Sequence, residues 1–194
     1  MLSAVEIARG VHGALRFLQR DPAAPYLFEN SFEACARSFR LMALVAPLWA
    51  FDLAMQYSRY QTDAALWEVA LLEALQYLFN WLFFPVVMWE IARRTGHVGV
   101  WPRYITALNW ITLPSMVVLV MAGAVAQVAP AVVTTIVLFS VQGLFFYWFL
   151  TTTVSVLGVG WGFAGGLLLI NWLPLVMLSL AVRRILGLVP AIGG

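Results

Sequence analysis

The sequence contains no lysine, a single cysteine and few charged residues of either sign. Only 10% of its 194 residues are charged, whereas 63% are hydrophobic, and the mean hydropathy is +0.89. Soluble domains carry roughly a quarter charged residues, so this chain has too little polar sequence to cover a soluble core of its length. The net charge of +2 is too small to indicate nucleic-acid binding. The composition therefore predicts an integral membrane protein with the lipid bilayer as its main partner.

The long apolar runs predict an all-α bundle of five transmembrane helices. A crossing needs ~20 apolar residues, and residues 104–182 contain no charged residue, which leaves room for three crossings. Turns are expected at Pro130 and in the Gly-rich segment 158–166; a re-entrant loop in that segment is the alternative and would return the C-terminus to the N-terminal side. The predicted spans are 41–57, 66–92, 104–126, 131–155 and 163–182, inside a membrane domain 39–184 that precedes a short tail, 185–194.

The first 38 residues are expected to lie at the membrane surface. Residues 2–20 place apolar side chains at three- and four-residue spacing, with basic side chains on the other face. Such a helix suits the headgroup region of an anionic membrane; the alternative is that its apolar stripe packs on the bundle itself. After a Pro-containing break, Asn30 and Glu33 are predicted to form the capping box of the next helix. The residues assigned to the lipid surface are Arg9, Arg16 and Arg20.

The basic residues, all of them arginine, predict an orientation. Eight lie before span one or between spans two and three, and three lie on the opposite side. Cytoplasmic loops are enriched in basic residues, so the N-terminus is expected in the cytoplasm. The all-arginine usage, together with abundant Ala, Val, Leu and Gly, indicates a GC-rich bacterium and hence its inner membrane.

A polar face in span two is the main candidate for a functional site. Four of its residues share one helix face because of their spacing, and Asp52 of span one is expected at a similar depth to Glu73. An ionisable group at that depth is costly unless it has a partner or faces water. One hypothesis is a cation- or proton-binding site in a cavity. The other is a polar clamp between helices. The candidate residues are Asp52, Glu73, Gln76, Tyr77 and Asn80.

Two repeated patterns predict helix packing. An Asn-Trp pair with a nearby proline occurs at Asn80, Asn109 and Asn171. Proline frees a backbone carbonyl within a membrane helix, and an amide side chain can satisfy it, so three kinked helices are expected to converge through their asparagines. Glycine also repeats every fourth residue at Gly158, Gly162 and Gly166, which lets a helix approach a neighbour closely.

The scarcity of cysteine and histidine excludes several kinds of chemistry. Cys35 alone excludes an internal disulfide or a multi-cysteine metal site. His12 and His97 lie outside the spans, which excludes paired haem ligation within the membrane. No nucleotide-binding loop or nucleophile elbow occurs. We therefore expect a non-enzymatic protein with no catalytic residues, no metal and no cofactor.

The layout of a short N-terminal region followed by five closely spaced spans resembles the bacterial branch of the Yip1-like membrane proteins. The resemblance covers residues 39–184 and implies a protein that organises the membrane or other membrane proteins, without assigning any residue a role. The first functional hypothesis is a scaffold or accessory subunit that contacts other membrane proteins or further copies of itself. The alternative is a small proton- or cation-coupled transporter or channel that uses Asp52 and Glu73.

Overall fold

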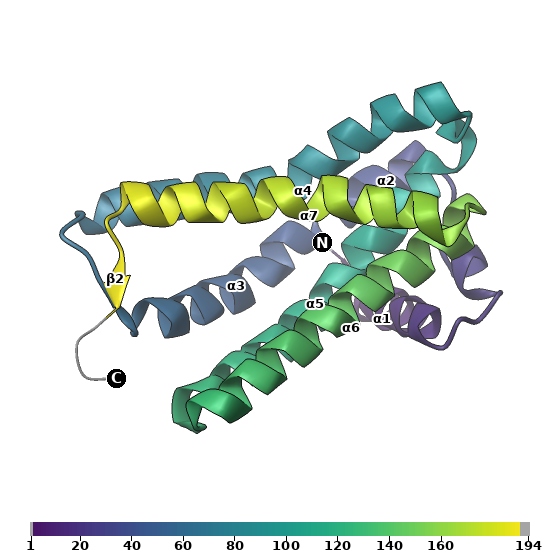
Figure 1. Cartoon of the computed structure of the whole chain (residues 1–194). Coiled ribbons are helices and arrows are strands. Elements are labelled where there is room, and N and C mark those ends of the chain that lie inside the picture. The colour runs from purple at the N-terminus through teal and green to yellow at the C-terminus, as the bar shows by residue number, and fades with distance from the viewer. Residues whose placement is uncertain (1, 191–194) are drawn as a thin grey trace.

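The computed structural model describes residues 2–190 and is an all-α bundle, as the sequence predicts (Figure 1). The elements are α1 (Ala4–Leu18), η1 (Ala24–Leu27), α2 (Phe32–Ser38), α3 (Leu41–Tyr57), β1 (Tyr60–Gln61), α4 (Leu66–Thr95), η2 (Val98–Val100), α5 (Trp101–Val128), α6 (Ala131–Leu157), α7 (Trp161–Ile185) and β2 (Val189–Pro190). Here η denotes a short 3₁₀ helix.

Five helices are long and apolar enough to cross a membrane, which confirms the predicted multi-pass bundle. Helices α4 to α7 each contain 25 to 30 residues, more than the ~20 that a bilayer core requires. Helix α3 has only 17 residues, and α2 extends the first crossing to Phe32–Tyr57. Helix α7 is continuous, so the glycine-rich segment is not a re-entrant loop.

The helices form two pairs that diverge toward one end of the bundle. Helices α5 and α6 form a hairpin, α4 lies beside α7, and α3 packs on α5 (Figure 1). At the open end β1 pairs with β2, with Tyr60 opposite Pro190 and Gln61 opposite Val189. We call this the β end; α1 and α2 lie at the other end. Helix α4 bends away from α7 in the half that contains Pro85, because proline interrupts the helical hydrogen bonds.

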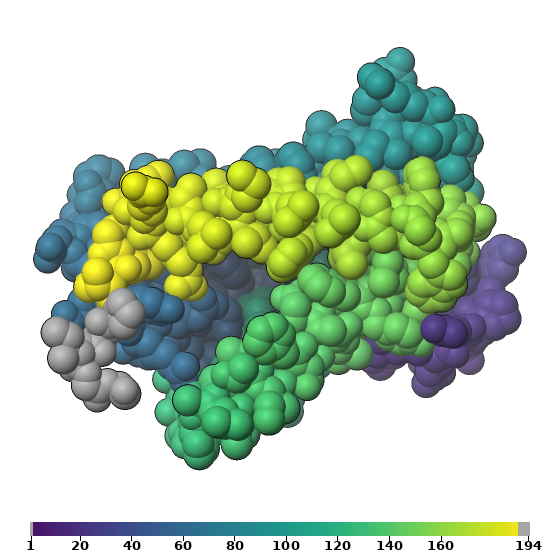
Figure 2. All heavy atoms as spheres, in the orientation of Figure 1, coloured from purple at the N-terminus to yellow at the C-terminus, as the bar shows by residue number. Residues whose placement is uncertain are grey.

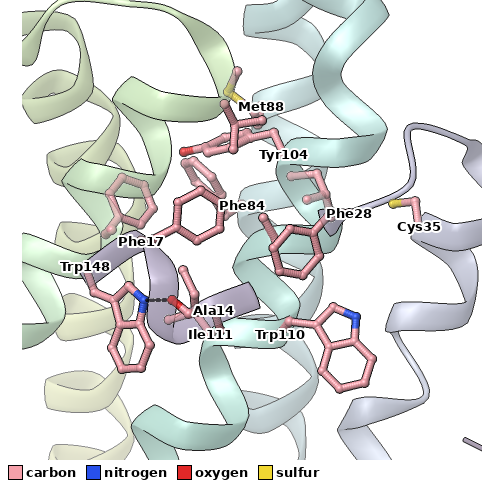
Figure 3. Packing of buried hydrophobic residues seen from close by; sticks show 14 of the residues in the cluster. Ala14, Phe17, Phe28, Cys35, Phe84, Met88, Tyr104, Trp110, Ile111 and Trp148 are labelled. Carbon is pink, nitrogen blue, oxygen red and sulfur yellow. Dashed lines mark hydrogen bonds between the residues drawn. The ribbon is translucent and has the colours of Figure 1, made fainter. Parts of the chain in front are cut away.

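The N-terminal helix packs on the bundle through its apolar stripe. Phe17 is fully buried, and the indole Nε1 of Trp148 on α6 donates a 2.8 Å hydrogen bond to the carbonyl of Ala14 (Figure 3). A Cβ atom at Gly10 would lie 2.2 Å from the Trp110 ring of α5. Only glycine therefore fits at this crossing of α1 and α5, and the bundle-packing alternative describes the apolar face of this helix.

The start of α2 differs from the prediction. Ser31, not Asn30, is the N-cap, and its Oγ accepts a 3.1 Å hydrogen bond from the amide of Ala34. The Asn30 side chain instead donates to the carbonyl of Gly99 at 2.7 Å and accepts from the amide of Arg103 at 3.2 Å. A long-range contact therefore uses the amide that local spacing assigned to the cap, and Asn30 ties α2 to the start of α5.

Candidate functional site

A small polar cavity lies at the β end, between α3, α4 and α7. Its volume is about 130 Å³, and we call it the vestibule. Glu73 is buried on its wall, where one carboxylate oxygen accepts a 2.7 Å hydrogen bond from the hydroxyl of Tyr57. The lining residues are Trp49, Leu53, Gln56, Tyr57, Tyr60, Glu73, Gln76, Ser179, Arg183 and Leu188.

The ends of three elements bring the vestibule residues together. Gln56 and Tyr57 belong to the last turn of α3, and Arg183 belongs to the last turn of α7. The Arg183 guanidinium donates to Gln56 Oε1 at 2.9 Å and lies 5.1 Å from the centre of the Tyr60 ring. The β1–β2 pair holds the two following loops together. Arg183 is one of the three arginines predicted on the side of the membrane opposite the N-terminus, and the structure places it in the vestibule wall.

The second predicted carboxylate, Asp52, faces a different neighbour. Asp52 is buried and accepts a 2.7 Å hydrogen bond from the side-chain amide of Gln56. Its Oδ1 lies 3.1 Å from the position that a Cβ would take at Gly123 on α5. Asp52 does not line the vestibule, and no hydrogen bond joins it to Glu73 among residues 2–190. The two acids therefore do not contact each other. Asp52 binds Gln56 and Glu73 binds Tyr57, which are adjacent residues of α3.

A larger cavity of about 610 Å³ lies between α4, α5, α6 and α7, and we call it the central cavity. All three asparagines of the Asn-Trp repeat line it, so the predicted convergence takes the form of a shared wall. Its walls carry amides, hydroxyls and aromatic rings, and no charged side chain of residues 2–190 contributes. The polar lining residues are Gln76, Asn80, Asn109, Thr112, Ser115, Gln142, Asn171 and Ser179; the aromatic ones are Trp81, Phe84, Phe145, Phe146, Phe149 and Trp172.

The amides of the central cavity differ in their hydrogen bonding. Asn109 donates to the hydroxyl of Ser38 at 2.8 Å and is therefore occupied by the protein. Gln76 has a buried Oε1 without a hydrogen-bond partner. The side chains of Asn80, Gln142 and Asn171 line the wall and form no hydrogen bond within residues 2–190. Unpaired amides inside a membrane protein are costly, so this wall has unused capacity to bind a ligand.

Gln76 and Ser179 line both cavities. Gln76 lies on α4 and Ser179 on α7. Each of these two neighbouring helices therefore contributes one polar side chain where the vestibule meets the central cavity. The predicted continuation of the polar face from Glu73 through Gln76 to Asn80 follows this boundary from the vestibule into the central cavity.

Tyr77 departs from the predicted polar path. Its hydroxyl donates to the carbonyl of Met42 on α3 at 2.7 Å, and its ring centre lies 4.7 Å from that of Trp49. It lines neither cavity. Tyr77 thus ties α4 to α3, which is the clamp that the second hypothesis assigned to the whole polar face.

The glycine repeat makes no close contact within the described chain. Gly158 ends α6 in the left-handed conformation, with φ of 67°. A Cβ at Gly162 or Gly166 would meet no atom within 4 Å. These glycines therefore do not pack against another helix within residues 2–190, because α7 turns this face outward; close packing against a helix of another protein or copy stays a prediction.

Two of the three arginines assigned to the lipid surface are held by the protein. Arg16 forms a 2.9 Å salt bridge with Asp21. The Arg20 guanidinium lies over the rings of Tyr147 and Trp161, at 5.5 and 5.1 Å from their centres. Arg9 is exposed and is the member of the set whose placement suits a lipid headgroup.

Sequence reasoning missed Gln56, Tyr57, Gln142 and Arg183. The spacing of Asp52 and Gln56 by four residues was a local signal for part of this group. Gln142 is an amide within an otherwise apolar span, which is a weaker signal of the same kind. Nothing local indicates that Arg183 reaches Gln56, which lies 127 residues earlier.

No protein-family model matches the sequence, no curated protein matches it, and no solved structure matches the fold. Within residues 2–190 there is no group of three or more His, Cys, Asp or Glu side chains that could hold a metal ion. The interpretation of the site therefore depends on its own geometry.

Proposed function

We infer that this chain is a non-enzymatic membrane protein that binds a small uncharged ligand in the central cavity and exchanges it with its surroundings. The supporting observation is the central cavity itself, which has a volume of about 610 Å³ and is lined by amides, hydroxyls and aromatic rings. In this form of the transporter hypothesis, the amides of the central cavity bind the ligand in place of the two carboxylates. Asp52 and Glu73 then have structural roles at the ends of α3 and α4.

The size and chemistry of the central cavity favour a neutral ligand. Its volume of about 610 Å³ lies within the range of roughly 300–1,000 Å³ that is typical of small-molecule sites. A charged ligand in such a site would need a compensating charge, because burial of an unpaired ion is strongly unfavourable. Amides and hydroxyls satisfy a neutral polar ligand without that cost.

Cysteine labelling tests this function with N-ethylmaleimide as a neutral probe. The native Cys35 is buried and is replaced by serine, after which Ser115→Cys and Ser179→Cys are prepared singly and reconstituted in liposomes. N-ethylmaleimide is expected to modify both cysteines at least tenfold faster than it modifies native Cys35. A charged methanethiosulfonate should modify Ser179→Cys, beside the vestibule, and spare Ser115→Cys. If the neutral reagent reaches neither position, the cavity is closed and the proposed function is wrong.

An accessory-subunit role is the second candidate, and the open glycine face of α7 favours it. Gly162 and Gly166 are exposed and meet nothing within 4 Å of a Cβ position, so a helix of another protein or copy could approach closely. Purification in mild detergent tests this candidate. A partner or dimer that is lost in Gly162→Leu and retained in Gly143→Leu, an exposed glycine on α6, would support it.

The proposed location is a bacterial inner membrane with the N-terminus in the cytoplasm. The excess of arginine at the end of the bundle that holds α1 and α2 supports this orientation. We also propose that the chain is related to the Yip1-like proteins, because it has the same layout of five closely spaced helices. Neither proposal adds a residue to the site.

A further inference from the structure

The vestibule is too small to admit a ligand that fills the central cavity. Its volume is about 130 Å³, which corresponds to about four water molecules at ~30 Å³ each. The central cavity is several times larger, at about 610 Å³. The two cavities share only Gln76 and Ser179 in their walls, so a ligand matched to the central cavity must use a route other than the vestibule.

The surface is open on the side of the bundle between α6 and α7. Helices α6 and α7 are in contact near the loop 158–160 that joins them, and they diverge toward the β end. Figure 2 shows that the surface is hollowed between the C-terminal half of α7 and the N-terminal half of α6. The two helices on either side of this opening carry exposed apolar side chains, among them Phe139 of α6 (75% exposed) and Met177 of α7 (69% exposed). In a membrane such side chains contact acyl chains, so an opening between these helices faces the bilayer.

The polar groups inside the cavity determine which head group a ligand from the bilayer can have. Gln76 lines the cavity and has a buried Oε1 without a hydrogen-bond partner in the described part of the chain; an unpaired acceptor is satisfied by a hydroxyl donor. Asn80, Gln142 and Asn171 offer further amide groups on the same wall. None of the described residues that line the cavity is charged, so a phosphate head would be buried without a counter-charge.

Aromatic rings form the walls beside these amides. Phe84 and Phe149 meet edge to face with ring centres 5.5 Å apart, and Phe146 and Trp172 do so at 5.3 Å. Phe146 belongs to α6 and Trp172 to α7, so this second pair closes the cavity where the two helices touch. The walls thus offer an apolar surface next to a neutral hydrogen-bonding group, which suits an amphiphile.

We propose that the ligand of the central cavity is a neutral acylglycerol, which enters from the bilayer between α6 and α7 and places its hydroxyl-bearing head against Gln76. This inference rests on the proposed function, because it assigns the ligand class of the same cavity. The acyl chain extends back through the lateral opening.

Binding of radiolabelled 1-oleoylglycerol to the purified full-length protein in nanodiscs tests the ligand class. One hydrogen bond contributes ~0.5–1.5 kcal/mol, so Gln76→Leu is expected to weaken binding by about two- to twelvefold. Gln61→Leu is the matched control, because Gln61 is an exposed amide on β1 that lines neither cavity. Asn171→Leu serves as a second variant if Gln76→Leu does not fold, as judged by its helical circular dichroism and thermal unfolding.

Two competitors separate the parts of the inference. Oleoyl lysophosphatidic acid has the same chain with a charged head and should compete at least tenfold more weakly; equal competition would overturn the requirement for a neutral head. Decylubiquinone carries carbonyl acceptors and no hydroxyl donor, and equal competition by it would overturn the role of Gln76 as acceptor.

If N-ethylmaleimide reaches Ser115→Cys while 1-oleoylglycerol does not bind, the acylglycerol assignment fails and the proposed function stands. If Gln76→Leu binds as Gln61→Leu does, the assignment fails as well.

Discussion

Substitution of Gly10 by alanine is expected to detach α1 from the bundle. The added Cβ would lie 2.2, 2.2 and 2.6 Å from three atoms of the Trp110 indole, whereas carbon atoms pack at about 3.5–4.0 Å. The indole ring is rigid and itself buried, so α1 must move outward by more than 1 Å, on the order of the difference between these distances. That movement also strains the hydrogen bond from Trp148 to the carbonyl of Ala14.

The magnitude follows from three contributions. Overpacking of a buried contact costs about 1–3 kcal/mol, and loss of the Trp148 hydrogen bond costs about 1 kcal/mol. Alanine in place of glycine within a helix stabilises it by about 1 kcal/mol. The free energy of unfolding should therefore fall by about 1–3 kcal/mol. The control is Gly143→Ala on α6, where a Cβ meets nothing within 4 Å.

Limited trypsin digestion and thermal unfolding in nanodiscs measure this effect. Trypsin should cleave Gly10→Ala after Arg9 and Arg16 at least several times faster than it cleaves the wild type, because α1 spends more time away from α5 and α6. The midpoint of thermal unfolding should fall as well. Equal digestion rates for Gly10→Ala and Gly143→Ala would refute the assignment of α1 as a packed part of the bundle.

Three further predictions concern the acidic residues and the orientation. Glu73→Leu should lower the free energy of unfolding by about 1–3 kcal/mol, because it leaves the hydroxyl of Tyr57 unpaired. Glu73→Gln keeps an acceptor for this hydroxyl and should lower it by less than about 1 kcal/mol. Equal losses for the two variants in steric-trapping measurements would contradict the hydrogen bond. Gly123→Ala should cost about 1 kcal/mol by the same assay, because its Cβ would lie 3.0 Å from Met55 and 3.1 Å from Asp52; a stability equal to that of wild type would show that α3 yields at this crossing. In a Cys35→Ser background, an impermeant maleimide should label Gln61→Cys in intact cells and label Gly99→Cys only after permeabilisation, and the reverse pattern would invert the proposed orientation.

The course of the chain through the membrane could be predicted because span length and turn residues are local properties. Residues 41–57 were assigned as a helix and form α3, and the other spans extend the predicted ranges by a few residues. Helix ends project beyond the apolar core, so hydropathy underestimates their length. The Asn30 cap was wrong because two adjacent residues, Asn30 and Ser31, both suit a cap, and a contact with α5 decides between them.

The central cavity could be predicted only in part, because it depends on how helices diverge. Asn80, Asn109 and Asn171 all line this cavity, but their shared pattern could not show that, within residues 2–190, Asn109 alone of the three finds a protein partner. Likewise, the spacing of Gly162 and Gly166 fits a packed face, and the face is open because α7 contacts α4 and α6 on its other sides. Such distinctions depend on the rotation of each helix about its own axis, which periodicity alone leaves undetermined.

The contact between Gln56 and Arg183 has a consequence for biosynthesis. Its two residues are separated by 127 positions, and a ribosome adds roughly 5–20 residues per second. About 6–25 s therefore pass between synthesis of the last turn of α3 and synthesis of the arginine that binds it. During this interval Gln56 and the β1 strand have no partner from α7 or β2, so the β end is assembled last.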